Sequence, residues 1–201
     1  MLKEVTFSYL NKYFFVWSTY DPSCKTEVYS YALIRDKKLI LIDPIEPSAD
    51  CEEELLKAGP PALIILTNSN HERANTYWKN KYNLPLGASA SSVKDLSLMP
   101  EVILEDLKQI HTLKPIYLPG GAPGETALYH ETSKTMIVGD ALINLEETSF
   151  DILPAKYCSD QQELIQSLKK LLAFPFETLL MAHGAPLTEN PMGKLNKILS
   201  S

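Results

Sequence analysis

Residues 62–73 read Ala62-Leu63-Ile64-Ile65-Leu66-Thr67-Asn68-Ser69-Asn70-His71-Glu72-Arg73, an apolar run that passes directly into a polar one. The apolar part is short and continuous, which is typical of a β-strand buried on both faces. From about Asn70 to Tyr82 the residues have helical spacing, so we expect a helix to follow the strand. The stretch therefore predicts a strand–helix unit with polar side chains at the junction.

β-Hairpins are expected on both sides of this unit. Before it, residues 6–18 and 30–42 have the pattern of two hairpins, and the apolar run Leu39 to Ile42 is expected to form a central strand that stops at Asp43-Pro44. After it come a hairpin over residues 126–138, an amphipathic helix from residue 159, a strand over 178–182 and a C-terminal helix. Because the two halves have a similar order, we expect one domain, residues 1–201, with two packed sheets and helices outside.

Four further segments accompany residues 67–73. They are Leu39-Ile40-Leu41-Ile42-Asp43, Leu118-Pro119-Gly120-Gly121-Ala122-Pro123-Gly124-Glu125-Thr126, Met136-Ile137-Val138-Gly139-Asp140-Ala141-Leu142 and Leu179-Leu180-Met181-Ala182-His183-Gly184. In order, spacing and content, the five segments resemble landmarks of the metallo-β-lactamase superfamily, whose central motif is T-H-x-H-x-D-H between a buried strand and a helix. The resemblance covers roughly residues 30–185. It implies an α/β fold in four layers, an αββα sandwich.

The resemblance also implies which positions would face a pair of metal ions. With Thr67 on the motif's Thr, the first metal would be held at the positions of Asn68, Asn70 and Gly121. An amide is a poor zinc ligand compared with imidazole, and glycine has no side chain to offer. We therefore expect the first metal site to be lost.

The second metal would be held at the positions of Glu72, Arg73, Asp140 and His183. Arg73 places a permanent cation there, and two like charges about 4 Å apart at an effective dielectric near 20 repel by about 4 kcal/mol. We expect Arg73 to act as a counter-ion paired with Asp140, in a pocket without a metal or other cofactor. The alternative is one divalent metal (Zn, Fe or Mn) held by Glu72, Asp140 and His183.

Two histidines of these segments have further interpretations. His71 stands at a variable position of the motif, where it is a candidate catalytic base or a shifted ligand, although a loop or capping role explains it more simply. His183 is expected to hydrogen-bond Asp140 or Glu72. Outside the segments, Cys158 is more simply a loop thiol than a ligand, and a surface position is expected for His111 and His130.

Composition limits the classes of partner. The chain has 201 residues, a net charge of -6 and a pI near 5.3, without a basic run, which disfavours nucleic acid and anionic membranes. The N-terminus resembles neither a signal peptide nor a membrane anchor, and three scattered cysteines favour a reducing cytoplasm. We expect a small-molecule ligand of unknown type, and the sequence gives no indication of oligomeric state.

Three functions remain open. The first is a metal-free protein with a remodelled pocket that is non-catalytic or altered in function. The second is a hydrolase that uses the single metal described above. The third is a hydrolase without metal, in which His71 or His183 acts as the base and Arg73 stabilises an oxyanion.

Overall fold

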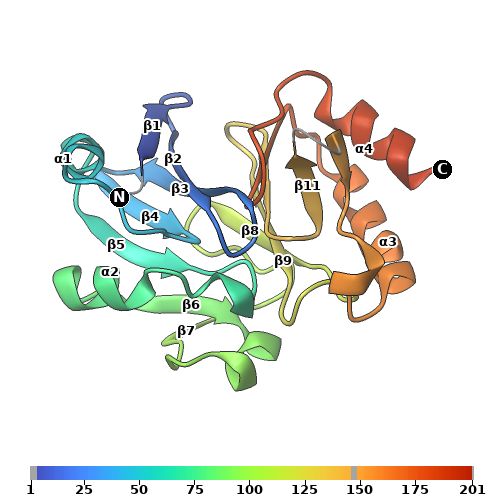
Figure 1. Ribbon diagram of the computed structural model, residues 1–201, viewed down its shortest axis with the longest axis horizontal. Helices are drawn as coiled ribbons and strands as arrows, with labels where there is room; N and C mark the ends of the chain where they lie inside the picture. The colour runs from blue at the N-terminus through green and yellow to red at the C-terminus, as the bar shows by residue number, and fades with distance from the viewer. Residues whose placement is uncertain (1–3, 146–148, 201) are drawn as a thin grey trace.

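The computed structural model describes residues 4–145 and 149–200, and in it two β-sheets pack together between two pairs of helices (Figure 1). Residues 1–3, which belong to the N-terminal stretch considered above, lie outside the described part. The first sheet has the order β1-β2-β3-β4-β5-β6-β7, with strands at Val5–Tyr9, Phe14–Asp21, Thr26–Arg35, Lys38–Ile42, Pro61–Ile65, Leu86–Ser89 and Val102–Leu104. The second has the order β13-β10-β9-β8, at Thr178–Met181, Thr135–Val138, Thr126–His130 and Leu113–Tyr117. A separate ribbon pairs β11 (Leu142–Leu145) with β12 (Ser149–Ile152).

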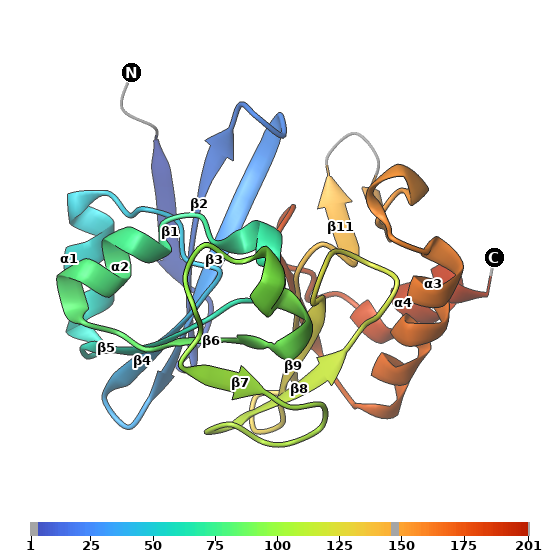
Figure 2. The same ribbon diagram turned by 90° about the horizontal axis from the view of Figure 1, so that it is seen from below.

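The helices form the outer layers. α1 (Ala49–Lys57) and α2 (Asn75–Tyr82) lie on the first sheet, whereas α3 (Gln161–Leu168) and α4 (Pro191–Leu199) lie on the far side of the second (Figure 2). Short 3₁₀ turns complete the chain: η1 (Ser69–His71), η2 (Ala90–Asp95), η3 (Ala155–Tyr157) and η4 (Lys169–Ala173). The predicted αββα sandwich is confirmed. No helix in the described ranges is long and apolar enough to cross a membrane.

Strand β4 shows why the sheets pack in this order. Leu39 and Leu41 belong to the cluster between the first sheet and its helices, whereas Ile40 and Ile42 belong to the cluster between the two sheets. Successive side chains of a strand point to opposite faces, so an apolar strand can serve both layers. The prediction of a central strand covered on both faces is therefore confirmed.

The helix expected from Asn70 begins later. The chain first makes the 3₁₀ turn η1, then passes through Arg73 in a left-handed conformation with φ of 35°, and α2 starts only at Asn75. A left-handed residue interrupts the hydrogen-bonding pattern of a right-handed helix. The interruption decides which side chains of this segment face the interior, as described next.

Candidate functional site

The candidate site lies where strands of both sheets end. Asp43 directly follows β4, Asp140 comes two residues after β10, and His183 comes two residues after β13. Strands β4 and β5 are parallel, as are β10 and β13, so their carboxyl ends lie at the same edge of each sheet. The sandwich thereby brings together polar residues that are far apart in the sequence.

Asp140 is the centre of the cluster. Its Oδ1 lies 3.0 Å from His71 Nε2 and 3.1 Å from His183 Nε2. Its Oδ2 accepts from the Nδ2 atoms of Asn68, at 3.2 Å, and Asn70, at 3.5 Å. A carboxylate has about four lone-pair positions, so these four nitrogens account for its accepting capacity. Burial disfavours its charged form, but the contacts with His71 and His183 outweigh burial and hold the pKa of Asp140 well below its usual value.

His71 bridges two carboxylates. Its Nδ1 lies 2.9 Å from Asp43 Oδ2, opposite the Nε2 contact with Asp140, and the side chain is only 3% exposed. Burial alone lowers the pKa of an imidazole, but the charges of Asp140 and Asp43 outweigh it and raise the pKa of His71 to about 9. At neutral pH the ring is therefore an imidazolium that donates to both acids. Thr67 donates to Asp43 from its main-chain N at 2.8 Å and from Oγ1 at 2.5 Å, which fixes that carboxylate.

The amide of Asn68 presents its donor side to the acids. Besides Asp140, its Nδ2 donates to Glu125 Oε2 at 2.8 Å, while its Oδ1 accepts from the main-chain N of Asn70 at 2.9 Å. The reverse orientation would place the amide oxygen against two carboxyl groups. Hydrogen bonding thus turns the only metal-binding atom of this amide away from Asp140.

Glu125 is a member of the cluster that the sequence did not reveal. Its side chain is buried, and Oε1 accepts from the main-chain N of Ala141 at 3.1 Å. Burial, and secondarily the nearby charge of Asp140, raises the pKa of Glu125 to about 8, so the group is mostly neutral at pH 7. A Cβ added at Gly121 would lie 3.2 Å from Glu125 Cγ. The glutamate therefore fills space beside Gly121, the position where the family loop has its histidine. The sequence feature that could have indicated Glu125 is the presence of an acid at the end of that loop.

Glu72 and Arg73 do not take the places expected for them. The Glu72 carboxylate accepts from the main-chain N of Ser97 at 3.0 Å, from Ser97 Oγ at 2.9 Å and from the main-chain N of Leu98 at 3.2 Å, so it lies outside the cluster. Turn η1 and the left-handed backbone at Arg73 rotate His71 inward instead. The expected metal set Glu72, Asp140 and His183 is accordingly not brought together.

Arg73 does not pair directly with Asp140. Its Nη1 donates to the main-chain oxygens of Tyr29, at 2.7 Å, and Asp43, at 3.0 Å. Burial lowers the pKa of Arg73, while Asp43 and Asp140 oppose that shift, and a guanidinium remains charged under these conditions. Its influence on the two acids is therefore exerted through space and not through a hydrogen bond.

The remaining candidates lie elsewhere. Cys158 Sγ donates to the main-chain oxygen of Leu153 at 3.4 Å, and Cys158 is not part of the group suited to a metal. The surface position expected for His130 is wrong, because this side chain is buried against Tyr13 and Phe14 and bonds to Ser133. Within the described ranges, the group suited to a metal is His71, Asp140 and His183, whose ligand atoms all lie within 4.8 Å of one another.

Comparisons with known proteins place the fold in a family. A family model described as the metallo-beta-lactamase superfamily matches residues 8–201. The chain belongs to the metallo-β-lactamase superfamily. Among curated proteins, the "Probable metallo-hydrolase YflN" of Bacillus subtilis (strain 168) is 31% identical over 83 residues, which are 36% of this chain and 31% of that protein. The match thus spans about a third of the relative.

Solved metallo-β-lactamases share the whole architecture. The DIM-1 enzyme superposes with a TM-score of 0.80 at 12% identity, over 98% of this chain and 97% of that one. The enzyme from Erythrobacter litoralis gives 0.78 at 14% identity over 98% and 96%, and that from Pontibacter korlensis gives 0.79 at 12% over 98% and 100%. These superfamily relatives support the fold alone at such low identity.

Proposed function

We propose that this metallo-β-lactamase-fold protein works without metal, and that its remodelled pocket binds a small molecule and does not hydrolyse it. The observation that carries the proposal is the environment of Asp140, whose two oxygens face four side-chain nitrogens. Hydrogen-bond donors stand where a bridging carboxylate would meet two cations. A pair of metals does not fit this donor set.

The charges of the cluster support the same proposal. Asp43 and Asp140 carry the negative charges, and His71 and Arg73 carry the positive ones, while Glu125 is mostly neutral at pH 7. Unpaired charges buried in a protein are costly, and here each sign is matched by the other. The cluster is therefore neutralised by its own residues, without a need for divalent ions.

The position of Glu125 adds a steric argument. The third ligand of a first metal would have to come from position 121, which is glycine, and the Glu125 side chain already packs against that position. Asn68 and Asn70 present N–H groups to Asp140, and these groups cannot coordinate a cation. We therefore infer that the chain keeps the fold of a hydrolase, while a different network of polar side chains occupies its pocket.

A second candidate function is a hydrolase with one metal, held by His71, Asp140 and His183 in place of the set that includes Glu72. Two imidazoles and a carboxylate suit a divalent transition metal, and a carboxylate such as Asp43 on the far nitrogen of His71 is a common support for a metal-binding histidine. Such an ion would lower the pKa of a bound water. His71 would first have to lose a proton to bind it.

Elemental analysis of the protein, purified without chelator, separates the two functions. The metal-free proposal predicts far less than one equivalent of Zn, Fe or Mn, and no uptake of added zinc after desalting. Near-stoichiometric metal that is lost in Asp140→Ala would support the hydrolase and refute the proposal. An Asp151→Ala variant, changed at an exposed acid, serves as the matched control.

Location is a smaller part of the proposal. The three cysteines Cys24, Cys51 and Cys158 are free thiols, which favours a reducing compartment and hence the cytoplasm.

A further inference from the structure

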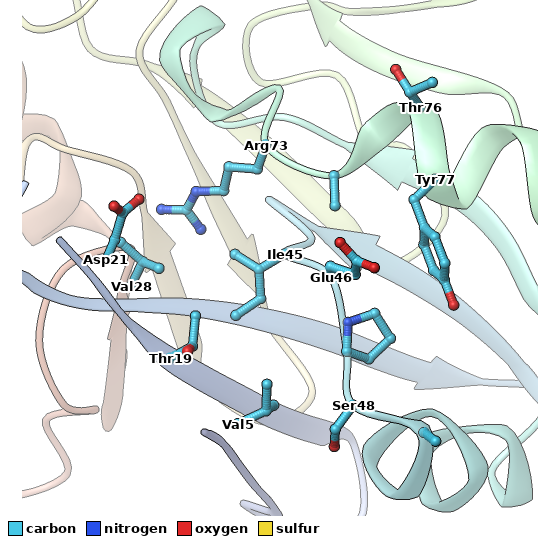
Figure 3. A pocket seen from close by; sticks show the side chains of 13 residues that line it. Val5, Thr19, Asp21, Val28, Ile45, Glu46, Ser48, Arg73, Thr76 and Tyr77 are labelled. Carbon is cyan, nitrogen blue, oxygen red and sulfur yellow. The ribbon is translucent and has the colours of Figure 1, made fainter. Parts of the chain in front are cut away.

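A cavity lies beside Arg73, separate from the groups around Asp140. It has a volume of about 960 Å³ and is formed by β1, β2 and β3, the segment that leads into α1, and the start of α2 (Figure 3). Ligand sites in proteins commonly have volumes of about 300–1,000 Å³. The cavity is therefore large enough for a small organic molecule, and the residues assigned above to the Asp140 cluster, Arg73 apart, do not line it.

The floor of the cavity is held rigidly. The main-chain oxygen of Ile45 accepts from Trp17 Nε1 at 3.3 Å and from Trp78 Nε1 at 3.1 Å, and its main-chain N donates to Ser30 Oγ at 2.9 Å. Prolines at positions 44 and 47 restrict the backbone on both sides of this residue. A wall fixed in this way is preorganised, so little conformational entropy is lost when a ligand packs against it.

Among the described residues that line the cavity, Arg73 is the cationic one. Its Nη1 is committed to two main-chain oxygens, while Nε and Nη2 have no bonded acceptor among the described residues. Figure 3 shows the guanidinium extending into the space between Asp21 and Ile45. The left-handed φ of 35° at this residue is uncommon outside glycine and is a form of strain that often accompanies binding sites.

The residues of the other walls indicate the chemical character of the rest of the ligand. Val5, Val28, Ile45 and Ala74 give the cavity apolar surface, and the Tyr77 ring extends it. We propose that the cavity binds a small monocarboxylate with an apolar body, whose carboxylate accepts from Nε and Nη2 of Arg73. A planar carboxylate matches the two parallel N–H directions of a guanidinium.

The acids of the lining restrict the charge of the ligand. Asp21 and Glu46 also face the cavity, and Glu46 is exposed on the rim. A second anionic group on the ligand, or a doubly charged phosphate, would be repelled by the Glu46 carboxylate. The site therefore selects one negative charge at the Arg73 end. Its occupation does not depend on whether His71, Asp140 and His183 hold a metal.

Calorimetric titration of the full chain with 4-phenylbutyrate tests the proposal, with 4-phenylbutylamine and 4-phenylbutanol as charge-reversed and neutral probes. We expect the carboxylate to bind more tightly than either probe, equally with and without chelator. Arg73→Lys keeps the positive charge but loses the two parallel N–H donors of the guanidinium, so the affinity for 4-phenylbutyrate should fall at least about tenfold. Arg35→Lys is the matched control, because Arg35 lies at the far end of β3 against His111 and Asp36.

Two further variants keep the test decisive if Arg73→Lys does not fold. Ala49→Trp places a large ring at an exposed position of the lining and should abolish binding. Glu46→Gln removes a repulsive carboxylate and should strengthen binding of the carboxylate. Absence of 4-phenylbutyrate binding at millimolar concentration, tighter binding of the amine, or unchanged affinity in Ala49→Trp would each overturn the proposal.

Discussion

Asp140 is the residue on which the charge balance of the pocket depends. Its carboxylate compensates His71 directly and acts on Arg73 through space. The family resemblance implied Asp140 and His183 as site residues, and the structure brings both together. It could not show that His71, and not Glu72, turns inward, because that choice depends on a left-handed backbone at Arg73 that no residue type there requires.

Replacing Asp140 by Asn should destabilise the fold. The substitution keeps the shape but leaves the His71 imidazolium with Asp43 as its single acidic partner. Removal of one member of a buried ion pair costs about 3–5 kcal/mol. We expect a loss of that size in the free energy of unfolding, measured by denaturant titration at pH 7. Asp151→Asn, at an exposed acid, should leave stability unchanged, and an equally small effect of Asp140→Asn would contradict the assignment.

The titration of Glu125 and His71 predicts that stability declines on the alkaline side. Both pKa values are raised in the folded state, to about 8 for Glu125 and about 9 for His71. The stability that each group contributes is full below its unfolded pKa and is lost as pH rises through its folded pKa. Asp140 has a lowered pKa, so its contribution is lost as pH falls. Unfolding free energy should therefore decrease between about pH 5 and pH 9.

Glu125→Gln should flatten that decline, since the amide imitates the neutral acid and does not titrate. Denaturant titrations at half-unit pH intervals provide the measurement. If the variant and the unmodified chain show parallel profiles from pH 5 to pH 8, Glu125 does not have a raised pKa.

At the scale of elements, strands were easier to predict than the segments that join them. The apolar runs of β4 and β5 are unambiguous, because each is covered on both faces. The start of α2 was placed too early, since helical spacing continues through residues that fold as η1 and a left-handed turn.

At the end of β10, Gly139 is packed so closely that a larger residue would not fit. A Cβ added at Gly139 would lie 2.4 Å from Thr67 Oγ1 and 2.8 Å from both Asn68 Nδ2 and Glu125 Oε1. Gly139→Ala should therefore displace the cluster and lower the melting temperature, at a cost of about 1–3 kcal/mol. Gly87→Ala is the control, because the nearest atom to its added Cβ, Ile64 O, lies at 3.4 Å. Equal melting temperatures for the two variants would contradict the close contact.

At the scale of the whole molecule, the order of five short segments was sufficient to predict the αββα sandwich. The sandwich is encoded redundantly, by apolar patterns in many of its strands and helices, so single departures do not change it. The interior of the site is encoded by a few polar residues, and Glu125 enters it only through the folded path of its loop. A fold can therefore be retained while the polar network inside it changes.

The protonation state of the His71 ring tests most directly whether protons and amide donors replace metals in this pocket. Nitrogen NMR of the histidine side chains, with His71→Gln for assignment, can be recorded at pH 7 before and after zinc is added. The metal-free arrangement predicts protons on both ring nitrogens and no change with zinc. A His71 ring with one deprotonated nitrogen, whose resonance shifts when zinc is added, would contradict it.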